Sequence, residues 1–93
     1  MIRSFKDKET QKLFMGRRSR AVSGQAVRRV QVKLAQLDQV ESVEELEVPP
    51  GNRLHALGGD REGQWAIRIN DQYRICFRFE SGDAYDVEAT DYH

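Results

Sequence analysis

The chain ends on three consecutive side chains that can take part in proton transfer: the carboxylate of Asp91, the phenol of Tyr92 and the imidazole of His93. They follow directly on a stretch that alternates like a β-strand, so a sheet would position them. Upstream lies His55, the other histidine of the chain. Arginines at alternating positions could surround the same place: Arg68, Arg74 and Arg78. Proton-transfer groups beside fixed cations point to chemistry on a phosphodiester.

RNA can be cleaved without a metal if three tasks are filled. A base takes the proton from the 2′-hydroxyl, an acid protonates the departing 5′-oxygen, and cations stabilise the charge on the phosphate. We expect His55 and His93 to transfer protons, either alone or together with Asp91, because the imidazole titrates near neutral pH. We expect Tyr92 to stack or to donate a proton, and Arg74 to hold the phosphate.

Each of these residues also has a purely structural interpretation. His55 is flanked by leucines and could be an ordinary strand residue, and the last three residues could form a solvated tail. On a continuing strand Asp91 and His93 would share the face opposite Tyr92, so all three would converge only if the tail turns. One cysteine and two histidines give no zinc-binding spacing, and we expect neither a metal nor a cofactor.

The first half of the chain has helical patterns. Residues 6–15 predict a short helix that Gly16 ends. A second, stronger helix is predicted from Ser23 onward, because apolar residues recur at steps of three and four and form one stripe: Ala26, Val27, Val30, Leu34 and Leu37. Ser42 and Glu45 have the spacing of a capping box, and residues 49–52 stop helical structure.

The second half switches to a period of two. This predicts three antiparallel strands in a meander, and the glycine-rich segment 58–63 reads as a hairpin turn. The apolar positions should face the core: Trp65, Ile67, Ile69, Tyr73, Ile75, Phe77, Phe79, Tyr85, Val87 and Ala89. The chain is therefore predicted to be one α+β domain, residues 1–93, with two N-terminal helices packed on a small, mostly antiparallel sheet of three to five strands.

The faces of the strands also predict their register. Loops of three residues, at 70–72 and 81–83, keep the apolar side chains on one face and set Arg68 opposite Arg74, and Arg78 opposite Asp86. The second pair is a cross-strand ion pair, whereas two arginines opposite each other repel. No acid has an equally obvious position beside the first pair, so an external anion would supply the missing charge. Extending the last strand brings Tyr92 near Arg74.

The zero net charge conceals a polarised chain. Residues 1–33 carry ten Lys and Arg against two acids, and residues 34–93 carry five Arg against thirteen acids. This asymmetry favours an anionic partner such as nucleic acid for the first half, although the two halves could also neutralise each other across the fold. The single Cys76 and the absence of a long apolar run favour a cytoplasmic protein with no membrane segment.

Three blocks of the sequence, in this order, resemble the HigB toxins, the plasmid-maintenance killer proteins of the RelE/ParE superfamily: residues 53–65, residues 69–75 and the terminal Asp91-Tyr92-His93. The resemblance implies a RelE-like fold and a ribosome-dependent endonuclease that cuts mRNA at codons in the A site. It also implies a cognate HigA-like helix-turn-helix antitoxin that neutralises the toxin and represses their operon. Operator DNA would be bound only through the complex with this antitoxin.

The resemblance also assigns residues. By position, the catalytic residues of the family correspond to His55, Arg74, Asp91, Tyr92 and His93. Its basic region, which faces RNA and the ribosome, corresponds to Arg17, Arg18, Arg20, Arg28, Arg29 and Lys33. Several family members carry lysine where this chain has Gly58. Here Arg61 or Arg68 would have to supply that charge, or turnover would be weak, because losing such a donor costs about 10²-fold or more.

Three functions are consistent with the sequence. The first is a ribosome-dependent mRNA endonuclease, which requires the terminal residues. The second is a non-catalytic inhibitor, like the branch of the superfamily that acts on DNA gyrase, which requires no proton donor. The third is a plain nucleic-acid-binding module, which predicts salt-dependent RNA binding without cleavage.

Overall fold

The computed structural model describes residues 1–92 and confirms both predicted helices. The first, α1, spans Lys8–Phe14 and begins at Asp7, whose carboxylate accepts a hydrogen bond from the backbone N–H of Thr10 at 2.7 Å. The second, α2, spans Ala26–Gln39. Each begins two or three residues later than the sequence predicts, as is usual for helix ends. No helix within residues 1–92 is both long enough and apolar enough to cross a membrane.

The connection from α2 to the sheet consists of two short 3₁₀ segments, η1 at Val43–Glu47 and η2 at Pro50–Asn52, and η1 starts with the predicted capping box. Asn52 is fully buried, and its amide donates to the carbonyl of Leu46 at 3.0 Å. The next residue, Arg53, has a left-handed backbone with φ 46° and ψ 50°. A non-glycine residue in this region is uncommon and is often associated with a functional site.

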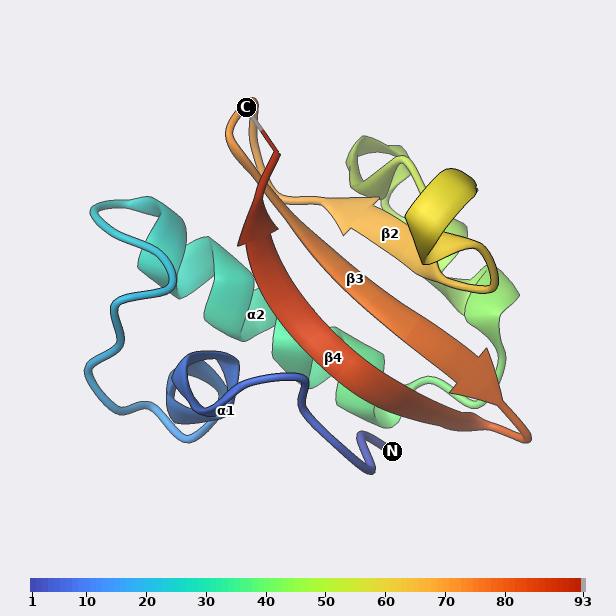
Figure 1. The fold of residues 1–93 in the computed structure, drawn as a ribbon, viewed down its shortest axis with the longest axis horizontal. Coiled ribbons are helices and arrows are strands. Elements are labelled where there is room, and N and C mark those ends of the chain that lie inside the picture. Colours follow the sequence, from blue (N-terminus) through green and yellow to red (C-terminus); the bar gives the residue numbers. More distant parts are fainter. Residues whose placement is uncertain (93) are drawn as a thin grey trace.

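The sheet has four strands in the antiparallel order β1-β2-β3-β4 (Figure 1). Their bounds are His55–Ala56 for β1, Trp65–Arg68 for β2, Tyr73–Glu80 for β3 and Asp83–Asp91 for β4. The predicted meander of three strands is confirmed, and β1 joins its edge through a hairpin whose connection contains the short 3₁₀ segment η3, Gly59–Arg61. At the other edge, Ile2 and Phe5 form isolated parallel bridges to β4.

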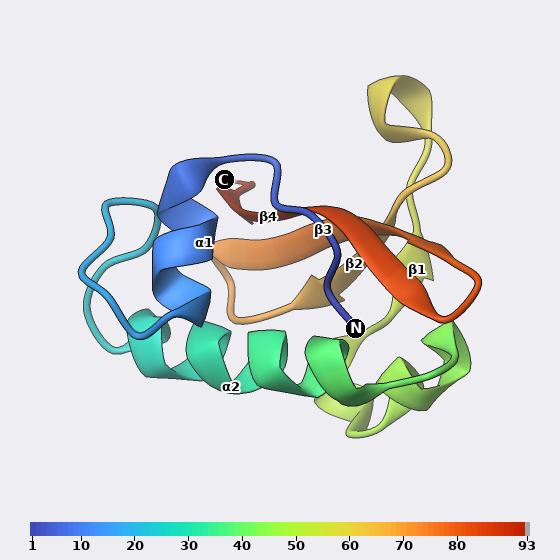
Figure 2. The same cartoon turned by 90° about the horizontal axis from the view of Figure 1, so that it is seen from below.

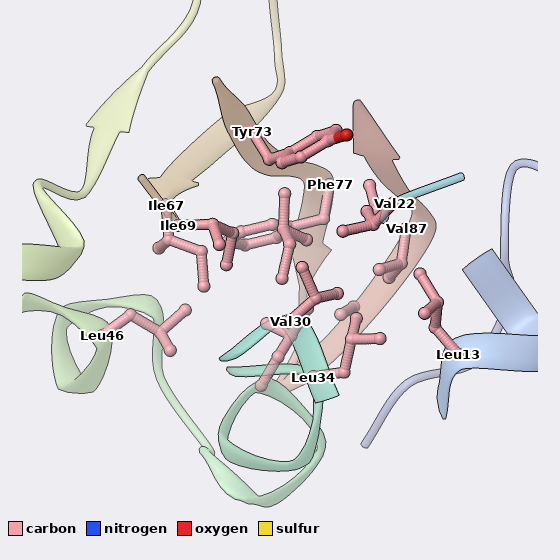
Figure 3. Packing of buried hydrophobic residues seen from close by; sticks show 14 of the residues in the cluster. Leu13, Val22, Val30, Leu34, Leu46, Ile67, Ile69, Tyr73, Phe77 and Val87 are labelled. Atoms are coloured by element: carbon pink, nitrogen blue, oxygen red, sulfur yellow. The ribbon is translucent and has the colours of Figure 1, made fainter. Parts of the chain in front are cut away.

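Figure 2 shows α2 beneath one face of the sheet, α1 beside β4 and reaching toward α2, and the β1–β2 hairpin standing out on the other side. The predicted stripe of α2 supplies much of the core, and Val30, Leu34 and Leu37 are fully buried. Figure 3 shows Val30 and Leu34 directed toward Phe77 of β3 and its neighbours. Burying side chains of this size contributes about 1.5–3 kcal/mol each. The helix layer leaves the opposite face of the sheet available for polar side chains.

The register of β3 against β4 changes within the hairpin. Next to the chain end the pairing is as predicted, with Arg74 opposite Thr90. Near the turn it is shifted by one residue, because the connection contains two residues, Ser81 and Gly82, rather than three. Both have positive φ, which two-residue hairpin turns favour. A β-bulge at Asp86, φ 53°, takes up the extra residue.

This bulge corrects the predicted core. Tyr85 does not face the helices, because the shifted register puts Ala84 in the core at 0% exposure and Tyr85 opposite Arg78. The guanidinium of Arg78 lies 5.5 Å from the centroid of the Tyr85 ring. The predicted ion pair between Arg78 and Asp86 nevertheless forms, with Nε and Oδ2 at 2.9 Å. This carboxylate is the main cause that raises the pKa of Arg78.

Candidate active site on the polar face of the sheet

The face of the sheet turned away from the helices brings His55 and two arginines into neighbouring rows. Across the strands, Ala66 is paired with His55 on one side and with Cys76 on the other. Arg68 is paired with Arg74, as predicted. Next to His55 and Arg74 this face carries the small, fully buried side chains of Ala66 and Cys76. Burial raises the pKa of the Cys76 thiol, so it stays protonated near neutral pH and is a poor nucleophile.

A pocket of about 350 Å³ opens at this place, and its lining residues are Arg53, His55, Arg68, Arg74 and Tyr92. Three of them, His55, Arg74 and Tyr92, are among the five predicted catalytic residues. Three of the five lining residues are arginines (Arg53, Arg68 and Arg74), so the pocket is strongly positive. Its lining contains a base, a phenol and several fixed cations, which are the groups that cleavage of a phosphodiester requires.

The end of the chain turns back onto the sheet at Tyr92. The backbone N–H of Tyr92 donates to the carbonyl of Gln72 at 3.0 Å, and its hydroxyl donates to the carbonyl of Asn70 at 2.8 Å. The aromatic ring thereby lies over Arg74, with the guanidinium carbon 5.2 Å from the ring centroid. The expected contact between the end of the chain and Arg74 is therefore present. Tyr92 is held in place by the hydrogen bonds of its backbone N–H and of its hydroxyl.

Arg74 lies in this pocket with a side chain that is uncompensated within the described residues. Its Nε is buried and has no hydrogen-bond acceptor within residues 1–92. Arg68, which lies opposite, does have an acid: its guanidinium is bound to the carboxylate of Asp71 in the β2–β3 turn. The expectation that no acid compensates the Arg68–Arg74 pair is therefore wrong for Arg68. It holds for Arg74, which forms no ion pair in the described part of the chain.

The imidazole of His55 is oriented by the strained residue two positions earlier. Nδ1 of His55 lies 2.8 Å from the carbonyl oxygen of Arg53. A carbonyl oxygen can only accept, so we assign the proton to Nδ1 in the neutral imidazole. Nε2 then carries the lone pair. The left-handed backbone of Arg53 thus supports the tautomer that a general base requires.

Asp91 is separated from the pocket. Its register partner is Tyr73, whose side chain belongs to the core face, and its Oδ2 accepts from Nε2 of Gln72 at 3.0 Å. Tyr92 and Asp91 therefore lie on opposite faces, as expected for successive strand residues. The prediction for His93 falls outside the described residues. Arg61 is directed to the sheet, where Nη1 pairs with Oε1 of Glu88 at 3.1 Å, and it does not line the pocket.

The predicted basic region is divided between two places. Three of its arginines lie exposed on the connection between α1 and α2: Arg17, Arg18 and Arg20. Glu9 fixes this connection, because it accepts from the backbone N–H of Arg20 at 2.7 Å and from Lys12 at 2.8 Å. These bonds hold the pKa of Glu9 at about 2, below its ordinary value of 4.5. Of the cations on α2, Arg28 and Arg29 are exposed and Lys33 is half-buried, and Arg29 and Lys33 line a groove beside β2.

The chain matches a known toxin family over nearly its whole length. Residues 3–93 match the model of the family described as RelE-like toxin of the type II toxin-antitoxin system HigB. The chain is a member of this HigB-like toxin family. It is 40% identical to the endoribonuclease HigB of Proteus vulgaris over the full length of both chains. It is 34% identical to the toxin HigB-1 of Vibrio cholerae, over 94% of this chain and 93% of the other.

Solved structures confirm the RelE-like α+β fold of this HigB-like chain. A mutant of YafQ from Escherichia coli superposes with a TM-score of 0.67 at 12% identity, covering 99% of this chain and 92% of the other. The YoeB/ParE toxin from Agrobacterium tumefaciens gives a TM-score of 0.57 at 13% identity, covering 99% and 98%. At such low identity these similarities concern the fold only.

Within this HigB-like chain, Arg53 is a candidate that sequence reasoning missed. Gly58 directly precedes η3, and a Cβ there would meet nothing within 4 Å. Arg53 and Arg68 line the pocket, whereas Arg61 is bound to Glu88. The sequence offered one signal for this role: Arg53 lies two residues before His55, and residues two apart on a strand share a face. Its left-handed backbone, which turns it into the pocket, has no such signal in the sequence.

Proposed function

We propose that this protein is an endoribonuclease toxin that cleaves translated mRNA by metal-free attack of a 2′-hydroxyl on the adjacent phosphodiester. The observation that carries the proposal is the buried Nε of Arg74, which has no acceptor within residues 1–92, in a pocket that also contains His55. An unsatisfied buried donor is costly and persists where function requires it. A phosphate oxygen is the acceptor that matches a guanidinium.

In the proposed reaction Nε2 of His55 accepts the proton of the 2′-hydroxyl. The 2′-oxygen attacks phosphorus, and the bond from phosphorus to the 5′-oxygen breaks. The leaving oxygen takes a proton from His93, which gives a 2′,3′-cyclic phosphate and a 5′-hydroxyl end. Arg74 and Arg53 stabilise the charge that grows on the phosphate. Tyr92 holds Arg74 in place and offers its exposed ring edge to a base.

Asp91 has a different role in this proposal. Its side chain lies away from the pocket and contacts Gln72, so it acts on the orientation of the chain end rather than on the phosphate. The exposed arginines of the α1–α2 connection extend the contact with RNA or with the ribosome. Type II toxin families function with an antitoxin, and we propose a HigA-like helix-turn-helix partner in the cytoplasm, with operator DNA bound through that complex.

The test is to map new 5′ ends of mRNA in a translating extract, with wild-type protein and with His55→Gln and His93→Ala. Each variant should keep its melting temperature within a few degrees, since both positions lie at the surface or at the chain end. We expect cuts at in-frame positions with the wild type only. The 5′ ends should carry hydroxyl groups, which a kinase can label without prior phosphatase treatment.

Other outcomes identify other functions. Equal cutting of purified RNA without ribosomes would contradict the ribosome dependence. Full cutting by both histidine variants would contradict the assignment of the proton-transfer groups. Inhibition of DNA supercoiling with no new mRNA ends would support the non-catalytic alternative, which the named relatives do not favour.

A further inference from the structure

A second positively lined groove lies beside the candidate active site, between α2 and the edge of β2. It measures about 290 Å³, and its lining residues are Arg29, Lys33, Pro49, Gly51, Arg68 and Ile69. The groove exists because β1 is only two residues long and pairs with β2 no further than Ala66. Beyond Ala66 this side of β2 is not paired with β1, and the groove there is bordered by α2 and by Pro49 and Gly51.

Three cations line this groove, and no carboxylate is among the lining residues. Arg29 is fixed, since its Nη1 donates to the carbonyl of Ile69 at 3.1 Å. Lys33 follows one helical turn later and forms no ion pair within the described chain. Burial, followed by the charge of Arg29, lowers the pKa of Lys33. Arg68 is already bound to Asp71. Arg29 and Lys33, in contrast, lie close together with no carboxylate among the lining residues, so an external anion would stabilise these two cations.

The groove and the candidate active site share one residue. Arg68 lines both of them: it lies opposite Arg74 on the polar face and borders the edge that faces α2. A strand of RNA whose scissile phosphate lies at Arg74 can therefore continue past Arg68 around the edge of β2. There it meets Arg29 and Lys33.

We propose that this groove binds a neighbouring phosphate of the same RNA strand, with Arg29 and Lys33 as its ligands. This inference rests on the proposed function and adds a binding subsite to it. Contacts to phosphate position the strand without reading its sequence. The subsite therefore sets the direction in which RNA leaves the active site rather than the choice of base.

The experiment measures the affinity of the free protein for a short RNA that is not cleaved, because each 2′-hydroxyl is replaced by hydrogen. Arg29→Gln/Lys33→Gln is compared with Lys6→Gln/Lys8→Gln, which removes the same charge from exposed positions at the start of α1. The slope of log affinity against log salt changes by about 0.7 for each phosphate contact to a single strand. We expect the groove variant to lose about one such step and the control variant to lose none.

A dinucleotide with a single phosphate separates the two proposals. The groove variant should bind it as tightly as the wild type, because the single phosphate occupies the Arg74 pocket. An unchanged salt slope with the longer strand would overturn the groove inference alone. Failure of Arg74→Met to weaken the dinucleotide would contradict the proposed function.

Two further measurements separate loss of RNA binding from misfolding and from binding of a protein partner. Lys33→Gln alone breaks no hydrogen bond within residues 1–92, so it tests the groove even if the double variant is poorly folded. Weaker binding of an acidic antitoxin segment, with RNA binding unchanged, would assign the groove to a protein partner and overturn the inference.

Discussion

Replacing Arg74 by methionine should stabilise the free protein while it abolishes cleavage. Methionine keeps the length and the apolar stem but removes the guanidinium. The buried Nε of Arg74 has no acceptor within residues 1–92, and such a group costs about 1–3 kcal/mol. The lost interaction with the Tyr92 ring, 5.2 Å away, is worth about 0.5–1 kcal/mol at a partly exposed site. The net gain is roughly 0–2.5 kcal/mol, with a central value of about 1 kcal/mol.

For a domain of this size each kcal/mol raises the melting temperature by about 4–8 °C. For the central value of about 1 kcal/mol, calorimetry or thermal unfolding followed by circular dichroism should show an increase of about 4–8 °C for Arg74→Met. Cleavage in the translating extract should fall by about 10²–10³-fold, the usual effect of removing one donor to the transition state. Inorganic phosphate should raise the melting temperature of the wild type and not that of the variant.

Arg78→Met is the matched control, since Arg78 lies on the same strand and also beneath a tyrosine ring. Its guanidinium is compensated by Asp86 at 2.9 Å and Glu80 at 3.0 Å, so its removal should lower stability slightly and leave cleavage unchanged. The reasoning is refuted if Arg74→Met melts below the wild type as Arg78→Met does. It is equally refuted if Arg74→Met retains cleavage within about tenfold of the wild type.

The remaining predictions concern the packing of α1. Glu9→Gln should lower stability above pH 5, because the pKa of Glu9 is held at about 2, below its ordinary 4.5. The Glu9 carboxylate stabilises the folded protein fully above its ordinary pKa of 4.5. This stabilisation is lost as the pH falls toward the lowered pKa of about 2. Urea denaturation from pH 6 to pH 2 should show the free energies of unfolding of wild type and variant converging. A difference in free energy that stays constant with pH would contradict this prediction. Thr10→Val should cost about 1–3 kcal/mol, since the buried hydroxyl of Thr10 accepts from the N–H of Ala89 at 3.0 Å. Denaturation at neutral pH measures this, and a loss below about 0.5 kcal/mol would show that the bond is replaced.

Periodicity in the sequence was sufficient to predict the layers and much of the site. The apolar stripe of α2 and the alternation of β2 and β3 depend on neighbours a few residues apart, so they can be read directly. The same alternation placed Arg68 opposite Arg74 and predicted that Tyr92 would approach Arg74. The turn at Ser81 and Gly82 was misjudged, because a bulge adds a residue without changing the pattern.

The sequence by itself determined which residue types were available for chemistry and which face of the sheet they share. It did not determine that Arg53 turns into the pocket, that Asp71 compensates Arg68, or that Nδ1 of His55 meets a carbonyl. These facts depend on one left-handed residue, on one turn and on contacts between segments far apart in the chain. Side-chain periodicity fixes the face on which a residue lies, whereas the backbone conformation of a few turn residues fixes which groups on that face meet.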